Sequence, residues 1–201
     1  MKKKLLLFCT LVMPIIVYLL LYQGEYQYKT LPILTEKVAE LDSKNHSFKN
    51  KLSVVCFLGN DQPKYKASLF NINQLIYKRY QEKPFFQMVA FIPTSAKPEF
   101  TKTIEELAGF TNLEKWHFIF EEEKKINEVF KSLKTPCKLD KDLYNPHAFI
   151  IDTALRLRGR SRTSKNHCGY DTTNVSELKK EMRDDISILY YAGLKDVEIL
   201  K

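Results

Sequence analysis

Hydrophobic and polar positions divide most of the chain into alternating strand-like and helix-like segments. Apolar runs of strand length at about 53–58, 84–93 and 115–120 lack regular polar alternation, which is typical of strands buried on both faces of a parallel sheet. After each run, apolar residues recur at helical spacing. These three predicted helices span residues 67–80, 96–110 and 121–133.

The C-terminal part of the chain predicts a strand hairpin and then a strongly amphipathic helix. Residues 146–160 contain two strand-like runs joined by a tight turn at 152–154. Asn174 and Glu177 have capping-box spacing at the start of a helix that runs to about residue 191. Right-handed crossovers would make the first three strands parallel, and the hairpin would add an antiparallel edge. We therefore expect an α/β fold, a thioredoxin-like sandwich with a central mixed sheet and helices on both faces.

The N-terminal segment is a long apolar run that follows three lysines. Residues 5–22 carry no charged side chain, and a helix of that length rises about 27 Å, close to the hydrocarbon thickness of a bilayer. A cleaved signal peptide is the alternative, but no small-x-small cleavage site follows the run. Lysines before the run favour a cytoplasmic N-terminus. We expect a single-pass anchor in the inner or plasma membrane, with an extracytoplasmic domain that is periplasmic in a Gram-negative cell.

Length and charge fit one folded domain with a short appendage. The 201 residues carry a formal net charge of +8, but acidic residues are interspersed, so we expect no nucleic-acid partner. Arg156, Arg158 and Arg160 share one predicted strand face, which we expect to face water. No Gly-rich phosphate loop or Gly-x-Ser-x-Gly elbow is present, which argues against nucleotide binding and serine hydrolysis. The expected organisation is a basic stub at 1–4, the anchor at 5–22, a tether or loosely packed lead-in at 23–40 and the extracytoplasmic domain at 41–201.

Two groups of motifs carry a family resemblance that spans roughly residues 41–191. The first is "NLEKWHFIF" with the charged helix after it, and the second is "FIIDTALRLRG" followed by "YDTTNVSELKKEMRDDISILY". In order and spacing they resemble the Sco/SenC family, membrane-tethered thioredoxin-fold proteins of copper-centre assembly. "NPHAFIID" also resembles a strand of the broader redoxin group. That likeness implies that Pro146 occupies the group's cis-proline position.

The chain departs from this family at the turn after the first core strand. The family carries Cys-x-x-x-Cys there and a distant His, a soft ligand set suited to copper. Here residues 59–66 read "GNDQPKYK", without cysteine, and the family His falls close to Tyr144, with His147 out of register. A turn without thiolates has no nucleophile for disulfide exchange and no soft ligands. We therefore expect no metal and no cofactor, although the resemblance itself implies copper.

The cysteines outside the anchor occupy one strand and two loops. Cys56 alternates with apolar neighbours and is expected to be an inert core residue. Cys137 and Cys168 lie in loops that would reach the same end of the sheet, where we favour a structural disulfide. Two unpaired thiols, or a relocated redox or metal pair, are the alternatives. His147 and His167 would complete a mixed nitrogen–sulfur site, but no Cys-x-x-Cys or His-x-x-x-His spacing supports one.

The favoured function is a binding or accessory role in respiratory-oxidase assembly, as the resemblance implies, or in envelope redox homeostasis. The contact face would combine the 59–66 turn with the 134–147 loop. A thiol-disulfide oxidoreductase that uses Cys137 and Cys168 is the alternative, and a structural envelope protein is a third hypothesis. Whether the protein is an enzyme stays open, and activity is not favoured. The candidate residues of the contact face are Asn60, Asp61, Tyr144, Pro146 and His147.

Overall fold

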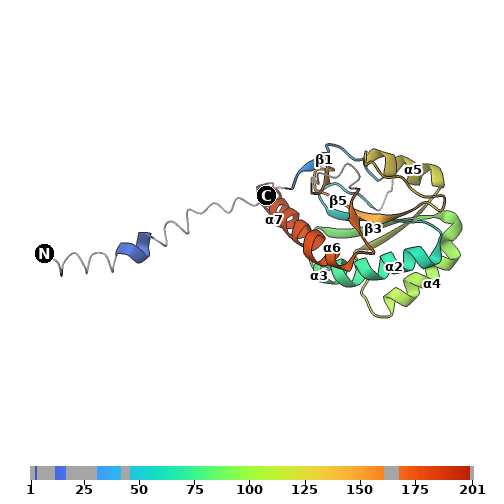
Figure 1. Ribbon diagram of the computed structural model, residues 1–201, viewed down its shortest axis with the longest axis horizontal. Helices are drawn as coiled ribbons and strands as arrows, with labels where there is room; N and C mark the ends of the chain where they lie inside the picture. The colour runs from blue at the N-terminus through green and yellow to red at the C-terminus, as the bar shows by residue number, and fades with distance from the viewer. Residues whose placement is uncertain (1–2, 4–11, 17–30, 42–45, 161–167, 200–201) are drawn as a thin grey trace.

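The computed structural model describes residues 3, 12–16, 31–41, 46–160 and 168–199, with side chains in the last helix described to residue 194. Its described part forms one seven-stranded sheet between two layers of helices (Figure 1). The strands are β1 (Ile33–Thr35), β2 (Leu52–Leu58), β3 (Phe86–Pro93), β4 (Trp116–Glu121), β5 (Tyr144–Ile151), β6 (Leu157–Arg158) and β7 (Tyr170–Asp171). Their order is β1-β6-β5-β2-β3-β4, and β7 pairs with β5.

Helices cover the two faces of the sheet unequally. One face is covered by α5, and the other by α2, α4 and the C-terminal helices (Figure 1). α6 (Val175–Glu177) follows its N-cap residue Asn174, whose side chain accepts hydrogen bonds from two backbone N–H groups, as the capping spacing predicts. The helical segments are α2 (Gln62–Ile72), η1 (Asn73–Tyr77), α3 (Lys78–Tyr80), η2 (Thr94–Ala96), α4 (Lys97–Ala108), α5 (Glu123–Ser132), α6 (Val175–Glu177), η3 (Leu178–Met182) and α7 (Arg183–Ile199).

The strand pairing confirms the predicted mixed sheet. β2, β3 and β4 are mutually parallel, whereas β5 is antiparallel to β2 and β6 is antiparallel to β5. Every residue of β2 and β3 is buried, as expected for apolar runs without polar alternation. The expectation of a fully buried strand at 115–120 is wrong, because β4 has one neighbouring strand and is half-exposed along much of its length.

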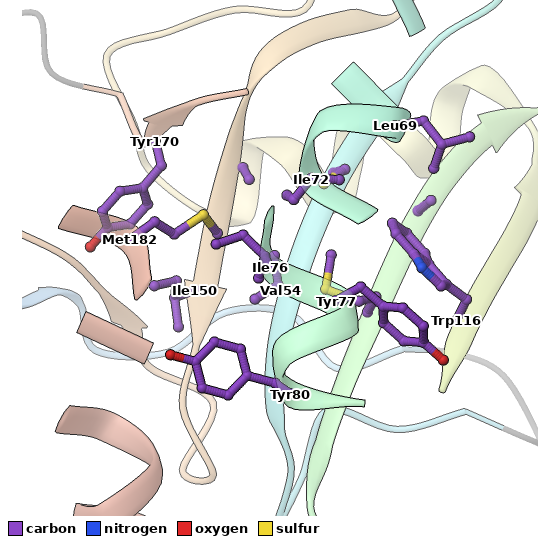
Figure 2. Packing of buried hydrophobic residues seen from close by; sticks show 14 of the residues in the cluster. Val54, Leu69, Ile72, Ile76, Tyr77, Tyr80, Trp116, Ile150, Tyr170 and Met182 are labelled. Atoms are coloured by element: carbon purple, nitrogen blue, oxygen red, sulfur yellow. The ribbon is translucent and has the colours of Figure 1, made fainter. Parts of the chain in front are cut away.

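The face toward α2, α4 and α7 holds the larger of two cores. Val54 of β2 and Ile150 of β5 point into it, where they meet residues of α2, η1 and η3 (Figure 2). Trp116 donates its indole N–H to Asn73, which in turn donates to Thr111, so a buried polar chain is satisfied inside this core. Because β2 and α2 pack into the same core, their relative position is fixed, and so is the position of the turn that connects them.

The opposite face, beneath α5, is packed with aromatic rings. The ring of Phe57 lies 5.2 Å from that of Phe91 and 5.0 Å from that of Phe130, measured between centroids. Phe149 of β5 is 5.9 Å from Phe130. Burial of such rings is worth several kcal/mol of stability across the cluster, on the order of 2 kcal/mol for each ring. α5 and the loop that follows it are therefore held firmly over this face.

The described part of the predicted lead-in belongs to the folded domain. β1 pairs with β6 at the sheet edge, and Val38 is fully buried in the core beneath α5. The predicted anchor at 5–22 lies outside the described residues except for 12–16. Among the helices in the described ranges, none combines the length and the apolar character that crossing a membrane requires.

The predicted water-facing arginines instead pair with acidic groups. Arg158 is buried and places a guanidinium nitrogen 2.8 Å from Asp152, and Arg156 contacts the same carboxylate. Arg160 lies 2.8 Å from Asp185, which is 1% exposed. The expectation that this face meets water is wrong for Arg158, because β6 lies between β1 and β5. The side chains of Arg156 and Arg160 stay 33% and 38% exposed, so these two still meet water while they pair with Asp152 and Asp185.

Candidate functional site

The turn after β2 lies directly against the 134–147 loop. Gly59 has a φ of 62°, a conformation that favours glycine. A Cβ at this position would collide with the carbonyl oxygen of Asp142 and the backbone of Tyr144. Asn60 donates its backbone N–H to the Asp142 carbonyl at 3.0 Å. The absence of a side chain at residue 59 therefore lets two backbones that are far apart in sequence come together.

One lysine connects the turn to the loop by its charge. Lys64, in the first turn of α2, places its Nζ 3.0 Å from both Asp61 and Asp140 and 3.6 Å from Asp142. Hydrogen bonds to Asp61 and Asp140 raise the pKa of Lys64 above its usual range. Burial opposes ionisation of Asp140, but hydrogen bonds from the Tyr144 N–H and from Lys64 lower the pKa of Asp140 overall. We call Asp61, Lys64, Asp140 and Asp142 the Lys64 cluster.

Tyr144 lies beneath this cluster rather than at the surface. It is 7% exposed, and its hydroxyl is 2.7 Å from Ser68 Oγ on α2. Thr172 donates its hydroxyl to the Pro146 carbonyl at 2.7 Å, and the same hydroxyl oxygen is 2.7 Å from Ser68 Oγ. Burial raises the pKa of Tyr144. These contacts join α2, β5 and the segment after β7, so Tyr144 supports the site from below and offers little area to a partner.

Pro146 and His147 lie at an irregularity in β5. Cys56 of β2 pairs with Ala148 and Phe57 pairs with Asn145, so these two residues are extra in the ladder. All peptide bonds between described residues are trans, and the expectation of a cis bond before Pro146 is therefore wrong. The bulge tolerates a proline in the strand without a missing ladder hydrogen bond.

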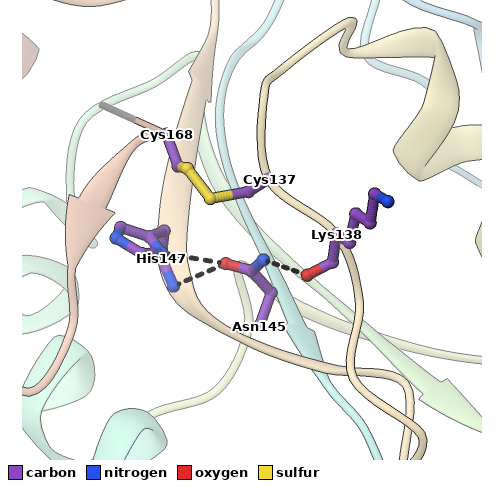
Figure 3. Close-up of a disulfide and its surroundings, with 5 residues drawn as sticks. All are labelled: Cys137, Lys138, Asn145, His147 and Cys168. Carbon is purple, nitrogen blue, oxygen red and sulfur yellow. Dashed lines mark hydrogen bonds between the residues drawn. A yellow bond between two sulfur atoms is a disulfide. The ribbon is translucent and has the colours of Figure 1, made fainter. Parts of the chain in front are cut away.

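Cys137 and Cys168 form a disulfide on the other side of the same loop (Figure 3). Their Cα atoms are 5.6 Å apart, within the usual range for a disulfide, and the predicted pairing is confirmed. A ring nitrogen of His147 and both sulfur atoms all lie within 4.8 Å of one another. The β5 bulge, the loop after α5 and the start of β7 thus bring two sulfurs and one imidazole together.

Asn145 holds the ring of His147 in place. Its side-chain amide donates to the Lys138 carbonyl at 3.0 Å, and its oxygen accepts from the His147 backbone N–H at 2.9 Å (Figure 3). The same oxygen is 3.1 Å from His147 Nδ1. Burial lowers the pKa of His147, although Asp171 and Glu177 act in the opposite direction. The ring is therefore neutral near pH 7, and it is fixed by a residue that is 3% exposed.

An open hollow adjoins the disulfide. It has a volume of about 410 Å³, and Cys137 lies in its wall with Phe130 and Leu139, while Lys131 and Lys138 are exposed at its lining. Cys137 is half-buried, and Cys168 is 3% exposed. Cys137 is therefore the more exposed residue of the disulfide.

The candidate residues chosen from the sequence fall into two groups. Asn60 is exposed and Asp61 is partly exposed at the turn, whereas Pro146 and His147 lie at the bulge near the disulfide. Lys64 and Asn145, the residues that hold each group together, were not predicted from the sequence. The charges in "DQPKYK" and "DKD" were the available signal for the Lys64 cluster.

Cys56, the remaining cysteine among the described residues, does not enter the site. Cys56 is a free cysteine buried in β2, and burial raises its pKa to about 12, so its thiol is inert at neutral pH. His167 and Cys9 lie outside the described residues. The described site therefore contains Cys137, Cys168 and His147, with Asn145 as their support.

Comparison with known proteins identifies the fold. No protein-family model and no curated protein sequence matches the chain. Among solved structures, it is similar to BsSco, described as a member of the Sco family of cytochrome c oxidase assembly proteins, with 16% identity over 83% of this chain and 98% of that one and a TM-score of 0.54. A SCO1/SenC family lipoprotein from Bacillus anthracis str. Ames is also similar, with 16% identity over 80% of this chain and 95% of that one and a TM-score of 0.51. The predicted Sco-like thioredoxin fold is thereby confirmed as a fold.

Proposed function

We propose that this protein is a membrane-anchored, extracytoplasmic accessory protein with a Sco-like fold. It acts by binding a partner in respiratory-oxidase assembly, or in envelope redox homeostasis, and it performs no thiol or metal chemistry at the 59–66 turn. The observation that carries the proposal is the Lys64 cluster. Where the Sco resemblance implies two cysteines, this chain has an ion-pair cluster that closes the turn onto the 134–147 loop.

The resulting surface is suited to contact rather than to catalysis. Asn60 is exposed beside Asp61, and both are backed by the buried Tyr144. Because Gly59 packs against the loop backbone, the turn has a fixed shape before any partner arrives. A preformed surface costs little conformational entropy on binding. The likeness of the fold to an oxidase-assembly protein supports a partner of that class.

The membrane location rests on the sequence. The uncharged run at 5–22 after three lysines favours an anchor with its N-terminus in the cytoplasm. The Cys137–Cys168 disulfide is consistent with a domain in an oxidising compartment. A fusion of a periplasm-dependent or extracellular reporter to the C-terminus of the full chain tests this orientation, since activity of a cytoplasm-dependent reporter instead would contradict it.

Deletion of the gene tests the assembly role. We expect membranes of the deletion strain to lose at least half of their copper-dependent oxidase activity, and the wild-type gene to restore it. Asn60→Arg should restore less, because the new side chain stands at the exposed turn. Glu114→Arg is the matched control, since Glu114 is also exposed but precedes β4, at the opposite end of the parallel strands from the turn after β2. Full oxidase activity and copper content in the deletion strain would rule out the role in oxidase assembly and leave only envelope redox homeostasis.

A thiol-disulfide oxidoreductase is the second candidate function. The observation that favours it is the place of Cys137, a half-buried residue, in the wall of an open hollow. A redox titration of the purified protein, with thiols counted at each potential, measures whether the disulfide cycles. A very negative midpoint together with no reduction of insulin would rule this candidate out.

A further inference from the structure

Three side chains that the fold brings together have the composition of a soft-metal site. Cys137 comes from the loop after α5, His147 from the β5 bulge and Cys168 from the residue two before β7. One ligand atom from each lies within 4.8 Å of the others (Figure 3). Thiolate sulfur and imidazole nitrogen are soft ligands that bind monovalent copper, whereas hard cations bind oxygen ligands.

We propose that, once the disulfide is reduced, Cys137, Cys168 and His147 bind one cuprous ion. The site rests on the proposed function and deepens it by naming the metal ion that the protein would carry. It lies apart from the 59–66 turn, whose one carboxylate, Asp61, pairs with Lys64. It also revises the sequence-based expectation of no metal. That expectation rested on the turn alone and on the lack of a familiar cysteine or histidine spacing.

The number of ligands favours a monovalent ion over zinc. The group found among the described residues has three members, two sulfurs and one nitrogen. Zinc is usually four-coordinate, so zinc bound to these three side chains would need a water molecule as its fourth ligand. Cuprous ion is satisfied by a soft ligand set of lower coordination number. The three side chains are half-buried or buried, which protects a bound cuprous ion from water and oxidants.

Hydrogen bonding prepares His147 for this role. The Asn145 amide donates to the Lys138 carbonyl, so its oxygen is the atom that faces His147 and can only accept. His147 Nδ1 therefore carries the proton, and the lone pair of the neutral ring is on Nε2. A ligand histidine whose second nitrogen donates to a fixed acceptor is the usual arrangement at metal sites.

Reduction of the disulfide opens the site. A dithiol, for example that of a partner thioredoxin-fold protein, attacks the Cys137 sulfur and breaks its bond to Cys168. The dithiol becomes a disulfide, and its two electrons and two protons appear as the Cys137 and Cys168 thiols. One cuprous ion then displaces both thiol protons, so two sulfur–metal bonds form and two protons are released. In the oxidised protein the sulfurs are bonded to each other and hold no thiolate to donate.

An anaerobic titration with Cu(I) against a chromophoric chelator tests the site. The full chain is purified in mild detergent and carries Cys9→Ser, which removes the thiol outside the described residues. We expect the phosphine-reduced protein to take one Cu(I) from the chelator, and the oxidised protein to take none. Cys137→Ser and Cys168→Ser should each weaken binding at least 100-fold, and His147→Gln roughly tenfold.

The reduced protein is the matched control for the cysteine variants, because all three lack the disulfide. Cys56→Ser should bind as the reduced protein does, since Cys56 lies in the core. X-ray absorption of the copper-loaded protein should show two sulfur ligands and one nitrogen ligand, and His147→Gln should lose the nitrogen.

Several results would overturn the inference. These are equal binding by the oxidised and reduced proteins, unchanged binding in Cys137→Ser, or tighter binding of zinc than of Cu(I) under the same conditions. Normal oxidase activity in the deletion strain, together with tight Cu(I) binding in vitro, would overturn the proposed role in oxidase assembly and leave the site intact. An oxidase defect in the deletion strain without Cu(I) binding in vitro would overturn the copper site and leave the proposed function intact.

Discussion

The 134–147 loop is held on two sides by different kinds of interaction. On one side the Lys64 cluster joins it to the turn after β2 through charges that are partly exposed to solvent. On the other side the disulfide joins it covalently to the residues before β7, next to a buried and hydrogen-bonded Asn145. Exposed charges respond to salt, whereas the covalent bond responds to reductant. The two sides therefore differ in what can release them.

The sulfur atoms of this protein do not lie at the turn where the Sco resemblance implies them. The turn after β2 is where the Sco resemblance implies thiols, and here it holds ion pairs and a left-handed glycine. The sulfur chemistry lies instead between the loop, β5 and β7. The scaffold can thus retain its topology while its reactive groups lie on different elements.

The largest expected effect comes from removing the disulfide. Cys137→Ser should lower the free energy of unfolding by about 3–4 kcal/mol, because a bridge between residues 31 positions apart restricts the unfolded chain. Urea denaturation of the variant and of the wild type, with and without reductant, measures this. Reductant should bring the wild type to the stability of the variant and leave the variant unchanged. A loss below about 0.5 kcal/mol would show that the loop is held without the bond.

The next largest effect should come from Gly59→Ala. Its φ of 62° and the collision of a Cβ with the Asp142 carbonyl predict a loss of about 2–3 kcal/mol in unfolding free energy. Gly109→Ala is the control, because Gly109 ends α4 in an ordinary helical conformation and should change stability little. Equal effects of the two substitutions in thermal unfolding would contradict the close approach of turn and loop.

The two central strands could be predicted from the sequence because burial on both faces leaves a direct mark on it. β2 and β3 are apolar at nearly every position since both of their faces are covered. β4 has a similar apolar run, and only its place at the sheet edge makes it half-exposed. That place depends on which strands pair, and a local pattern does not contain this information.

The site could be predicted only in part, for a similar reason. Two cysteines in loops at one end of the sheet were enough to favour the disulfide. The closeness of His147 to it depends on the β5 bulge, which shifts the register of the strand. Lys64 pairs with Asp140, which lies 76 positions further along the sequence, and only the tertiary fold brings these two residues together. Arg158 was misjudged because its strand gained a second neighbour in β1.

Acid should weaken the disulfide side of the loop through His147. Burial lowers the pKa of His147 in the folded protein, so the unfolded chain takes up a proton first as the pH falls below about 6.5. The contribution of the neutral His147 ring to the free energy of unfolding is therefore fully present above that pH, and it is lost as the pH falls toward the folded-state pKa. His147→Gln should reduce the loss between pH 7 and 5 by about 1 kcal/mol or less, measured by urea denaturation. His117, whose pKa burial lowers to about 4, acts in the same direction, so His117→Gln is measured beside it. An unchanged acid dependence in His147→Gln would contradict the buried, neutral ring.

The smallest effect is expected from Lys64→Gln, on the charged side of the loop. Lys64 is exposed over 42% of its side chain, and ion pairs in such surroundings are screened by solvent and salt. We expect a small decrease in the urea midpoint at low salt that disappears at high salt. Lys66→Gln, which breaks a surface pair with Glu106, is the control for the loss of one exposed ion pair. A large, salt-independent loss in Lys64→Gln alone would mean that the turn depends on its charges as strongly as the other side depends on its disulfide. In that case the contrast between the two sides would fail, because charge and sulfur would be equally essential to the position of the loop.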